Sequence, residues 1–294
     1  MKKLLVICGP TATGKTRLAV YLSKVFDGTV ISADSRQVYK YMDIGTGKEK
    51  PNGEKILGYD LIEPDEEFSV QKYVAFADKA INKTYKELKL PILVGGTGLY
   101  IKAVVDQLEK INIPRNLALR EKLAKSPAKE LFSILMAKSP SSAAKLNSSD
   151  RANPRRLIRL IEISDFGPLP SNQSSSSNFQ KKDVLFVGLT TSGKNLRERI
   201  EKRVEERIAD GFEKEVEFLK KKGFWNGAPH VTLGYRQWPD IEKWKLEEFR
   251  YAKRQMTWFK KDRRINWFDI TEPDWQEKVE RLVKKWYDRE SRYA

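Results

Sequence analysis

The chain has 294 residues, 40% of them hydrophobic, which is enough for a buried core in one large domain or two smaller ones. Its 56 Lys and Arg residues exceed its 40 Asp and Glu residues, and the formal charge of +16 attracts polyanions, nucleic acid first. A single cysteine, Cys8, and a single histidine, His230, exclude an internal disulfide and metal sites built on clusters of these residues.

No apolar run is long enough to span a membrane, so we expect no membrane contact. The apolar residues 4–8 are too few for a signal peptide and run directly into a glycine-containing loop. We therefore expect a cytoplasmic globular protein. Nothing in the sequence demands a dimer or an obligate protein partner.

Short apolar segments alternate with helical segments in the first third of the chain. Residues 3–8 predict a buried strand, and a helix is expected over 16–26. A second strand is expected over 29–33, a helix over about 70–88 and a third strand over 91–94. This alternation predicts an α/β fold with a parallel sheet, whose ligands gather at the carboxyl ends of the strands.

After residue 105 the chain becomes helical and basic, without strand-like runs. Three prolines mark helix starts in residues 115–165, namely Pro127, Pro140 and Pro154. A Pro- and Ser-rich segment at 166–178 is expected to be a flexible loop. A strand at 183–187 returns to the α/β pattern, and the rest is predicted to be helical and charged.

Residues 9–16 read Gly-Pro-Thr-Ala-Thr-Gly-Lys-Thr and match the phosphate-loop pattern G-x-x-x-x-G-K-[ST] between a strand and a helix. The glycines let backbone N–H groups cradle phosphate oxygens at a helix N terminus. Lys15 adds positive charge, and the hydroxyl of Thr16 is a ligand for Mg²⁺. The residues expected to bind phosphate are Gly9, Thr11, Ala12, Thr13, Gly14, Lys15 and Thr16.

A second near-match, at residues 188–195, carries Asn195 in place of the magnesium-binding hydroxyl, and we expect an ordinary capped turn there. The third strand ends in Gly-Gly-Thr-Gly at 95–98, without the acidic residue that helps many NTPases hold magnesium, which argues against a motor or GTPase. The other acidic candidate is Asp34, at the end of the second strand.

We therefore predict a P-loop NTPase-like parallel sheet core, formed by residues 1–109 and 181–294 with a helical C-terminal part. A mostly helical insertion domain at 110–180 interrupts this core.

Five further stretches resemble one family. Residues 34–39 read Asp-Ser-Arg-Gln-Val-Tyr, 42–48 read Met-Asp-Ile-Gly-Thr-Gly-Lys, and 93–100 read Leu-Val-Gly-Gly-Thr-Gly-Leu-Tyr. Residues 233–237 read Leu-Gly-Tyr-Arg-Gln, and 252–259 read Ala-Lys-Arg-Gln-Met-Thr-Trp-Phe. With the phosphate loop, in order and spacing over nearly the whole chain, they closely resemble the tRNA dimethylallyltransferase family. The resemblance implies transfer of a dimethylallyl group from dimethylallyl diphosphate to N6 of adenosine 37, next to the tRNA anticodon.

The resemblance implies a use for each part of the site. The phosphate loop would bind the diphosphate of the donor, and Lys15 with Mg²⁺ on Thr16 would stabilise the leaving group. Adenine N6 is a poor nucleophile, and Asp34 matches the family's general base. Thr97 matches a threonine beside the reacting groups, and Arg156 and Arg203 match arginines that hold the diphosphate. Turn capping by Asp34, a turn hydroxyl at Thr97 and surface ion pairs for the arginines are the alternatives.

The resemblance also assigns tRNA-contacting segments to residues 34–37 and 155–159, and the helical insertion domain is expected to contact the tRNA backbone. Phe249, Ala252, Met256 and Phe259 share a helical face predicted to be core, which leaves Trp258 and the basic residues around it for RNA. The residues predicted to bind tRNA are Asp34, Ser35, Arg36, Gln37, Thr97, Arg120, Arg155, Arg156, Leu157, Ile158, Arg159, Lys253 and Arg254. Together, the expected partners are the tRNA anticodon stem-loop and dimethylallyl diphosphate, with Mg²⁺ as cofactor.

Three other functions stay open at the level of sequence. An adenylate isopentenyltransferase would prenylate free AMP, ADP or ATP with the same loop and base, but would not need the basic insertion. A small-molecule kinase would hold a nucleotide in the loop and form no prenyl product. An RNA-binding protein with an inactive site is disfavoured by the intact Lys15, Thr16, Asp34 and Thr97.

Overall fold

The computed structural model describes residues 2–49, 54–167 and 183–289, without the side chains of residues 109 and 110. The chain divides into two compact units, Met1–Gln107 with Phe179–Ala294, and Leu108–Asn178. The Ser-rich part of the predicted flexible loop lies outside the described residues. Within the described ranges, no helix is both long enough and apolar enough to cross a membrane.

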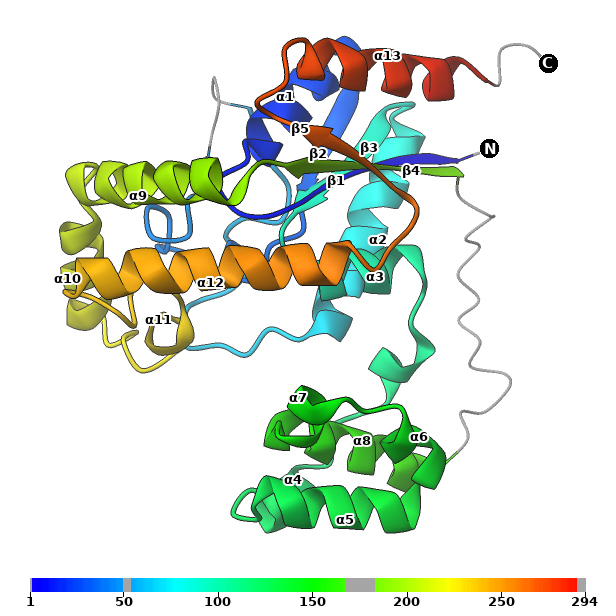
Figure 1. The fold of residues 1–294 in the computed structure, drawn as a ribbon, viewed down its shortest axis with the longest axis vertical. Coiled ribbons are helices and arrows are strands. Elements are labelled where there is room, and N and C mark those ends of the chain that lie inside the picture. Colours follow the sequence, from blue (N-terminus) through cyan, green and yellow to red (C-terminus); the bar gives the residue numbers. More distant parts are fainter. Residues whose placement is uncertain (1, 50–53, 168–182, 290–294) are drawn as a thin grey trace. The chain divides into compact units, whose positions relative to one another are not determined.

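The larger unit is built on a five-stranded sheet in the order β2-β3-β1-β4-β5, with parallel pairing throughout (Figure 1). This confirms the predicted α/β fold class with a parallel sheet. The strands are β1 (Lys3–Cys8), β2 (Gly28–Ser32), β3 (Leu90–Gly95), β4 (Asp183–Thr190) and β5 (Ile265–Asp269). In this order, the carboxyl ends of β1, β2 and β3 lie next to one another at one edge of the sheet.

The prediction that the chain after residue 187 is only helical is wrong. β4 continues to Thr190, and β5 pairs with it from Phe186↔Ile265 to Thr190↔Asp269. Ile265 is the one buried residue of β5, which forms an edge of the sheet. An edge strand this short and this polar has no continuous apolar run, so its sequence pattern does not separate it from the charged helices around it.

Alternate residues of β1 supply the cores on the two faces of the sheet. Leu5 and Ile7 pack with apolar residues of α1 and α13, whereas Leu4 and Val6 pack with residues of α2 and α3. These helices span α1 (Lys15–Val25), α2 (Val70–Lys86), α3 (Gly98–Val105) and α13 (Trp275–Tyr287). Figure 1 shows α1 and α13 on one side of the sheet and α2 and α3 on the other.

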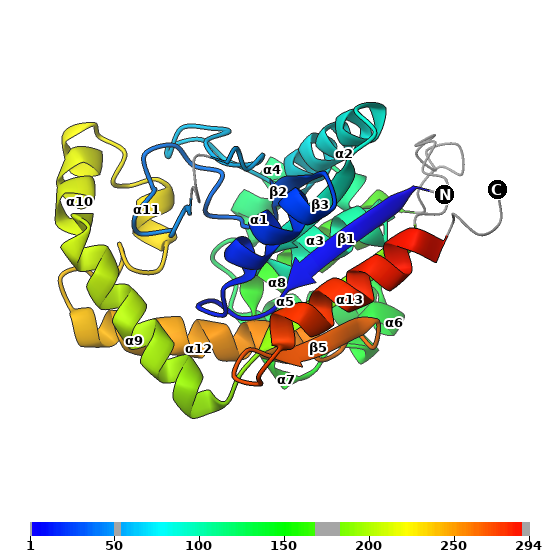
Figure 2. The ribbon, with the colours of Figure 1, turned by 90° about the horizontal axis from the view of Figure 1, so that it is seen from above.

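Four more helices extend this unit beyond the sheet (Figure 2). They are α9 (Gly193–Ala209), α10 (Phe212–Lys221), α11 (Ala228–Val231) and α12 (Ile241–Phe259). A core around Phe212, Tyr235 and Trp244 joins them to the loop after β2. At the start of α9, Ser192 is the N-cap and accepts the N–H of Asn195 at 3.2 Å, so the cap at the second near-match is Ser192 rather than Asn195.

The smaller unit is helical. Its elements are the short 3₁₀ helix η2 (Glu109–Asn112), α4 (Leu117–Leu123), α5 (Ala128–Lys138), α6 (Pro140–Ala144), α7 (Ser148–Arg151) and α8 (Pro154–Phe166). Pro127 is the N-cap of α5, whereas Pro140 and Pro154 are the first residues of their helices. Four completely buried side chains, Leu131, Leu135, Leu157 and Ile161, form its core between α5 and α8.

A buried carboxylate ties α8 to α4. Glu162 is 3% exposed, and Arg120 donates to its two oxygens at 2.6 and 2.8 Å. Arg159 donates at 3.2 Å, and the N–H of Asn116 donates at 3.0 Å. Burial alone would raise the pKa of Glu162, but the hydrogen bonds from the two arginines outweigh it and hold the pKa at about 2.

Replacing Glu162 with Gln should therefore destabilise the protein by about 2–3 kcal/mol at pH 7, because charged hydrogen bonds are lost. The folded pKa of about 2 lies below the ordinary value of 4.5, so Glu162 contributes its full stabilisation above about pH 4.5 and loses it as the pH falls toward 2. Urea unfolding, followed by circular dichroism at pH 7 and pH 3, measures the loss of unfolding free energy in E162Q. The exposed Glu130→Gln is the control, and an E162Q deficit of equal size at both pH values would contradict the assignment.

Candidate functional site

The phosphate loop, residues 9–14, joins β1 to α1. Gly9 has a φ of +133°, and a Cβ there would lie 2.4 Å from the carbonyl oxygen of Leu189 on β4, so only glycine fits. Gly14 caps α1 with a φ of 84°, in the left-handed region. The loop thus turns tightly against β4 and places the first turn of α1 at the carboxyl edge of the sheet, where a helix N terminus favours anions.

Lys15 begins α1 and lines the cavity at this edge. Its ammonium donates to the carbonyl oxygen of Pro10 at 2.5 Å. Burial, and then repulsion by Arg203, lowers the pKa of Lys15 from 10.5 to about 8. A bound anion would raise this pKa again because it favours the charged form, so the lysine is prepared to receive negative charge.

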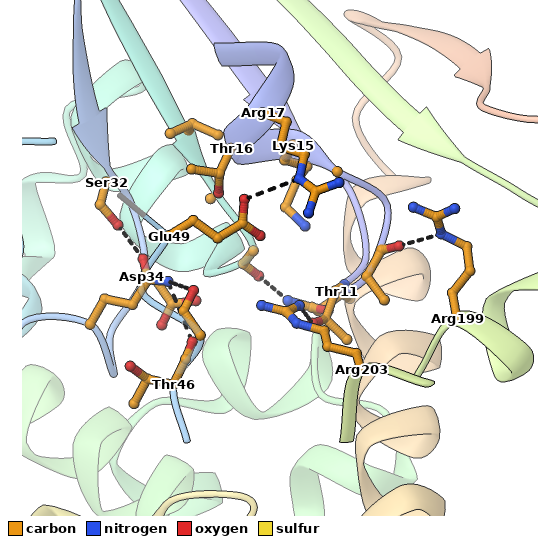
Figure 3. A pocket seen from close by; sticks show the side chains of 18 of the residues that line it. Thr11, Lys15, Thr16, Arg17, Ser32, Asp34, Thr46, Glu49, Arg199 and Arg203 are labelled. Atoms are coloured by element: carbon orange, nitrogen blue, oxygen red, sulfur yellow. Dashed lines mark hydrogen bonds and ion pairs between the residues drawn. The ribbon is translucent and has the colours of Figure 1, made fainter. Parts of the chain in front are cut away.

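Helix α9 contributes two arginines one turn apart to the loop (Figure 3). Arg203 donates to the hydroxyl of Thr11 at 2.8 Å, and Arg199 donates to the carbonyl oxygen of Ala12 at 2.7 Å. Burial, and then repulsion by Arg207, lowers the pKa of Arg203 to about 10. Arg199 was not among the predicted site residues, although its four-residue spacing from Arg203 places both on one face of the helix.

Asp34 and Thr97 lie on adjoining loops after β2 and β3. The N–H of Thr97 donates to the carbonyl oxygen of Ala33 at 3.2 Å, and the N–H of Ser35 donates to the Thr97 hydroxyl at 3.0 Å. Asp34 accepts the N–H of Arg36 at 2.8 Å, which fixes the carboxylate within its turn. The structure therefore brings the two loops together. Asp34 makes the turn bond that was its alternative role, whereas the Thr97 hydroxyl bonds to Ser35 in the other loop.

Gln255 on α12 links the phosphate loop to the end of β3. Its Oε1 accepts the N–H of Thr11 at 2.8 Å, and its Nε2 donates to the carbonyl oxygen of Gly96 at 2.9 Å. The side chain is buried, and a Cβ on Gly96 would lie 2.0 Å from Nε2. Gln255 is not among the predicted site residues, although a glutamine between the core positions Ala252 and Phe259 is an available signal.

These elements enclose a cavity of about 310 Å³ (Figure 3). Its cationic lining residues are Lys15, Arg17, Arg199, Lys202 and Arg203, and its acidic ones are Asp34, Glu49 and Glu206. The predicted phosphate-binding residues Thr11, Ala12, Gly14 and Thr16 also line it. The excess of cations suits a polyanionic ligand, and Asp34 provides an acceptor for a proton in the same cavity.

Two residues predicted to bind phosphate, Thr13 and Gly9, have structural contacts that stabilise the phosphate loop. Thr13 is 1% exposed and donates to the carbonyl oxygen of Pro10 at 2.9 Å. Gly9 packs against β4. Their predicted contacts with phosphate, through backbone N–H groups, stay predictions.

Oxygen ligands for a magnesium ion are available in the cavity. The Thr16 hydroxyl stands at the start of α1, and Asp34 and Glu49 contribute carboxylates to the same lining. Within the described residues, no group of three or more His, Cys, Asp or Glu side chains could hold a metal ion. The residues present fit Mg²⁺, because this ion commonly takes one or two protein ligands and completes its shell with substrate phosphates and water.

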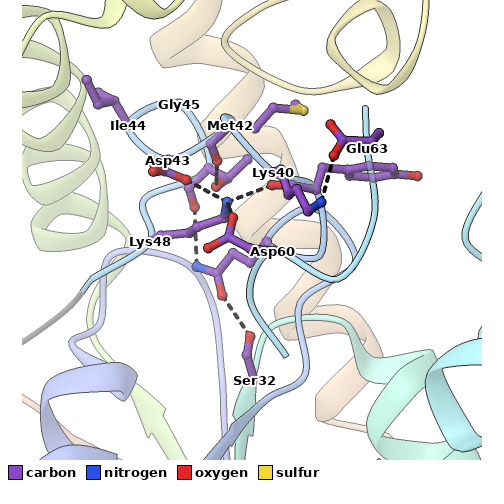
Figure 4. Close-up of polar contacts among 12 residues, drawn as sticks. Ser32, Lys40, Met42, Asp43, Ile44, Gly45, Lys48, Asp60 and Glu63 are labelled. Atoms are coloured by element: carbon purple, nitrogen blue, oxygen red, sulfur yellow. Dashed lines mark hydrogen bonds and ion pairs between the residues drawn. The ribbon is translucent and has the colours of Figure 1, made fainter. Parts of the chain in front are cut away.

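A buried lysine holds the wall of the cavity formed by the loop at residues 42–48 (Figure 4). The Lys48 side chain is completely buried, and its ammonium donates to Asp43, to Asp60 and to the carbonyl oxygen of Tyr39, each at 2.6 Å. Two carboxylates and a carbonyl therefore satisfy a charge that would otherwise be costly to bury.

Two further side chains hold the same loop. Glu215 on α10 accepts the N–H groups of residues 43–45 at 2.8–2.9 Å. Gln37 is buried, accepts the hydroxyl of Ser32 at 2.8 Å and donates to the carbonyl oxygen of Gly47 at 3.1 Å. Its side chain is thus engaged with the loop, and the predicted contact of Gln37 with tRNA stays a prediction.

The predicted RNA-contacting residues of the helical unit fall into two groups. Arg155 and Arg156 are exposed at the start of α8, where Arg156 pairs with Asp150 at 2.5 Å. The others serve the unit itself, since Leu157 is completely buried, Ile158 packs against the same core, and Arg120 and Arg159 bind Glu162. Arg156 lies in this unit, and its predicted contact with the diphosphate stays a prediction.

Helix α12 carries the remaining predicted RNA contacts. Lys253 and Arg254 are exposed on it, and Trp258 is 43% exposed. Ala252 and Phe259 are buried, as expected of the predicted core face, whereas Phe249 and Met256 are partly buried. The exposed cations next to an exposed indole form a surface that suits RNA.

Comparisons with known proteins agree on one family. The family model described as IPP transferase matches residues 37–262, more than half of the chain. The tRNA dimethylallyltransferase of Acetivibrio thermocellus is 38% identical over 97% of this chain and 97% of its own length. That of Finegoldia magna is 35% identical over 98% and 99%. The solved tRNA isopentenylpyrophosphate transferase of Bacillus halodurans is 31% identical, covers 99% of both chains and superposes with a TM-score of 0.72.

A pair of glycine substitutions tests the difference between the two phosphate-loop-like turns. Gly9→Ala should destabilise the protein by at least about 2 kcal/mol, because it combines an unfavourable φ with a clash against β4. Gly193→Ala in the second turn should change stability by less than about 1 kcal/mol, because no atom beyond its chain neighbours and its own helix backbone lies within 4 Å of the added Cβ. Urea unfolding measures both, and equal losses would contradict the close packing of the first loop.

Proposed function

This chain belongs to the IPP transferase family, and on that premise we propose that it transfers a dimethylallyl group from dimethylallyl diphosphate to N6 of adenosine 37 in tRNA. The products are N6-(dimethylallyl)adenosine and diphosphate. The observation that carries this proposal is one cavity that combines a phosphate loop, an excess of cations and the carboxylate of Asp34. A diphosphate leaving group and a nucleophile that must lose a proton require these two kinds of group together.

The diphosphate would bind at the start of α1. The loop N–H groups, the ammonium of Lys15 and the guanidinium of Arg203 provide positive charge where the leaving group develops negative charge. Burial lowers the pKa of Lys15 to about 8, which means that its charged form is poorly stabilised in the free protein. An anion that binds beside the ammonium stabilises this charged form. When bound at Thr16, Mg²⁺ supplies further charge neutralisation on the diphosphate.

Asp34 is the proposed general base. In the reaction, a bond forms between N6 and C1 of the donor. The bond between C1 and the ester oxygen of the diphosphate breaks, and diphosphate leaves with the electron pair. The proton of N6 passes to Asp34. The hydrogen bond from the Arg36 N–H to Oδ1 and the link from Thr97 to Ser35 hold this carboxylate in place.

The tRNA substrate is supported by the names of the relatives and by the basic surfaces of the chain. Exposed Arg155 and Arg156 on α8 and exposed Lys253 and Arg254 on α12 are the cations proposed to meet the anticodon stem-loop. The target adenosine must leave its stack to reach Asp34. A cytoplasmic location, where tRNA is found, follows from the same proposal.

Asp34→Asn separates catalysis from structure, because Asn keeps the oxygen that accepts the Arg36 N–H. We expect turnover to fall by about 10²-fold or more, because the general base is lost, while tRNA affinity changes little. Quantifying prenylated adenosine by mass spectrometry, with a parallel tRNA binding titration, measures both. The exposed Asp27→Asn serves as the control, and near-normal turnover of D34N would reduce Asp34 to a turn residue.

Arg155→Glu tests the proposed RNA surface of α8. It should weaken tRNA binding and reduce the slope of log K against log salt by about one, because a phosphate contact is lost. Binding titrations at several salt concentrations give the slope. Lys284→Glu on α13 changes the net charge equally outside the predicted RNA-binding segments and should leave the slope close to that of the wild type. An unchanged slope in R155E would remove Arg155 from the interface.

A further inference from the structure

Glu49 is a carboxylate in the middle of a cationic site. It lines the cavity together with Lys15, Arg17 and Arg203 (Figure 3). Its Oε2 is buried and has no hydrogen-bond partner among the described residues. Arg17, whose side chain is 85% exposed, forms an ion pair with that oxygen at 4.0 Å, which is beyond hydrogen-bond distance. A buried carboxylate oxygen without a hydrogen bond is costly, so a group outside the described chain is the natural partner for it.

The position of Glu49 follows from the loop that carries it. Lys48, the preceding residue, is anchored between Asp43 and Asp60. The carbonyl oxygen of Gly47 accepts a hydrogen bond from Gln37. The Glu49 side chain is 33% exposed, whereas its Oε2 is buried. Its presence at the phosphate site is thus set by a well-packed loop.

A carboxylate at this place opposes the binding of a bare diphosphate. It lines the same cavity as Lys15 and Arg203, and its negative charge partly offsets the positive charge that they offer to an anion. A divalent cation between the carboxylate and the diphosphate converts this repulsion into attraction. Mg²⁺ sites at substrate phosphates typically use one or two protein carboxylates in this way.

The other acidic residues of the cavity are less suited to this task, since Glu206 is 58% exposed and pairs with Lys202 at 3.9 Å. The end of β3 reads Gly95-Gly96, without the acidic residue that many phosphate-loop proteins place at a strand end. Asp34 accepts the N–H of Arg36, and as the proposed base it must stay available for a proton. A metal bound to Asp34 would lower its basicity and so weaken that role.

We propose that Glu49 is the protein carboxylate that binds the divalent cation, together with Thr16, when a diphosphate occupies the phosphate loop. This inference rests on the proposed function, because it assumes a diphosphate donor. It assigns to Glu49 the role that a strand-end carboxylate has in other phosphate-loop proteins.

The test is isothermal titration of inorganic pyrophosphate into the wild-type protein and the variants E49Q and E49D, with and without Mg²⁺. Mg²⁺ also binds pyrophosphate in solution, but equally for every variant, so the variants are compared by their Mg²⁺ enhancement of affinity. E54Q, an exposed glutamate paired with Lys24, is the matched control. Circular dichroism verifies that each variant is folded.

We expect Mg²⁺ to enhance wild-type affinity and this enhancement to fall about tenfold or more in E49Q. Without Mg²⁺, E49Q should bind pyrophosphate at least as tightly as the wild type, because a repulsive charge is gone. E49D should retain more of the enhancement than E49Q, and E54Q all of it. A wild-type enhancement that persists in E49Q would overturn this inference alone. A wild-type protein that binds no pyrophosphate would overturn the proposed function and this inference together.

Discussion

The close approach of the loops after β1, β2 and β3 is the constraint on which the whole site depends. A parallel sheet places these three strand ends side by side, and the loops touch because glycines allow it. A Cβ at Gly95 would lie 2.2 Å from the carbonyl oxygen of Ala33, so β2 and β3 meet without side chains between them. Gln255 then bridges Thr11 to Gly96 and makes the loops one rigid edge.

This edge of the sheet holds two positive charges whose proximity is unfavourable until an anionic ligand binds. Lys15 and Arg203 are both partly buried in the same cavity, and the pKa of each is lowered, mainly by burial. An anion relieves both desolvation and mutual repulsion, so the interactions that cost stability in the free protein favour diphosphate binding. Preorganised charge of this kind stabilises a leaving group without reorganisation at the moment of reaction.

Short sequence patterns were sufficient to predict the features that depend on residues close together in the chain. The phosphate loop, four of the strands and the position of Asp34 at a strand end follow from short patterns of glycines and apolar residues. The roles of Gln255, Arg199 and Glu49 depend on contacts between residues far apart in the chain, for example the hydrogen bond from Arg199 to Ala12. Helical spacing can mark Gln255 and Arg199 as facing inward, but it does not identify their partners. The edge strand β5 was missed for a related reason, since its pairing with β4 rather than its own apolar content makes it a strand.

The central claim, transfer of a prenyl group from a diphosphate donor to tRNA, is tested most directly by mass spectrometry of nucleosides. Unmodified tRNA is incubated with the protein, Mg²⁺ and dimethylallyl diphosphate, with AMP and ATP in parallel reactions. The account predicts prenylated adenosine in the tRNA reaction only. A prenylated free nucleotide would instead indicate an adenylate isopentenyltransferase, and the absence of product from every reaction would contradict the proposed activity.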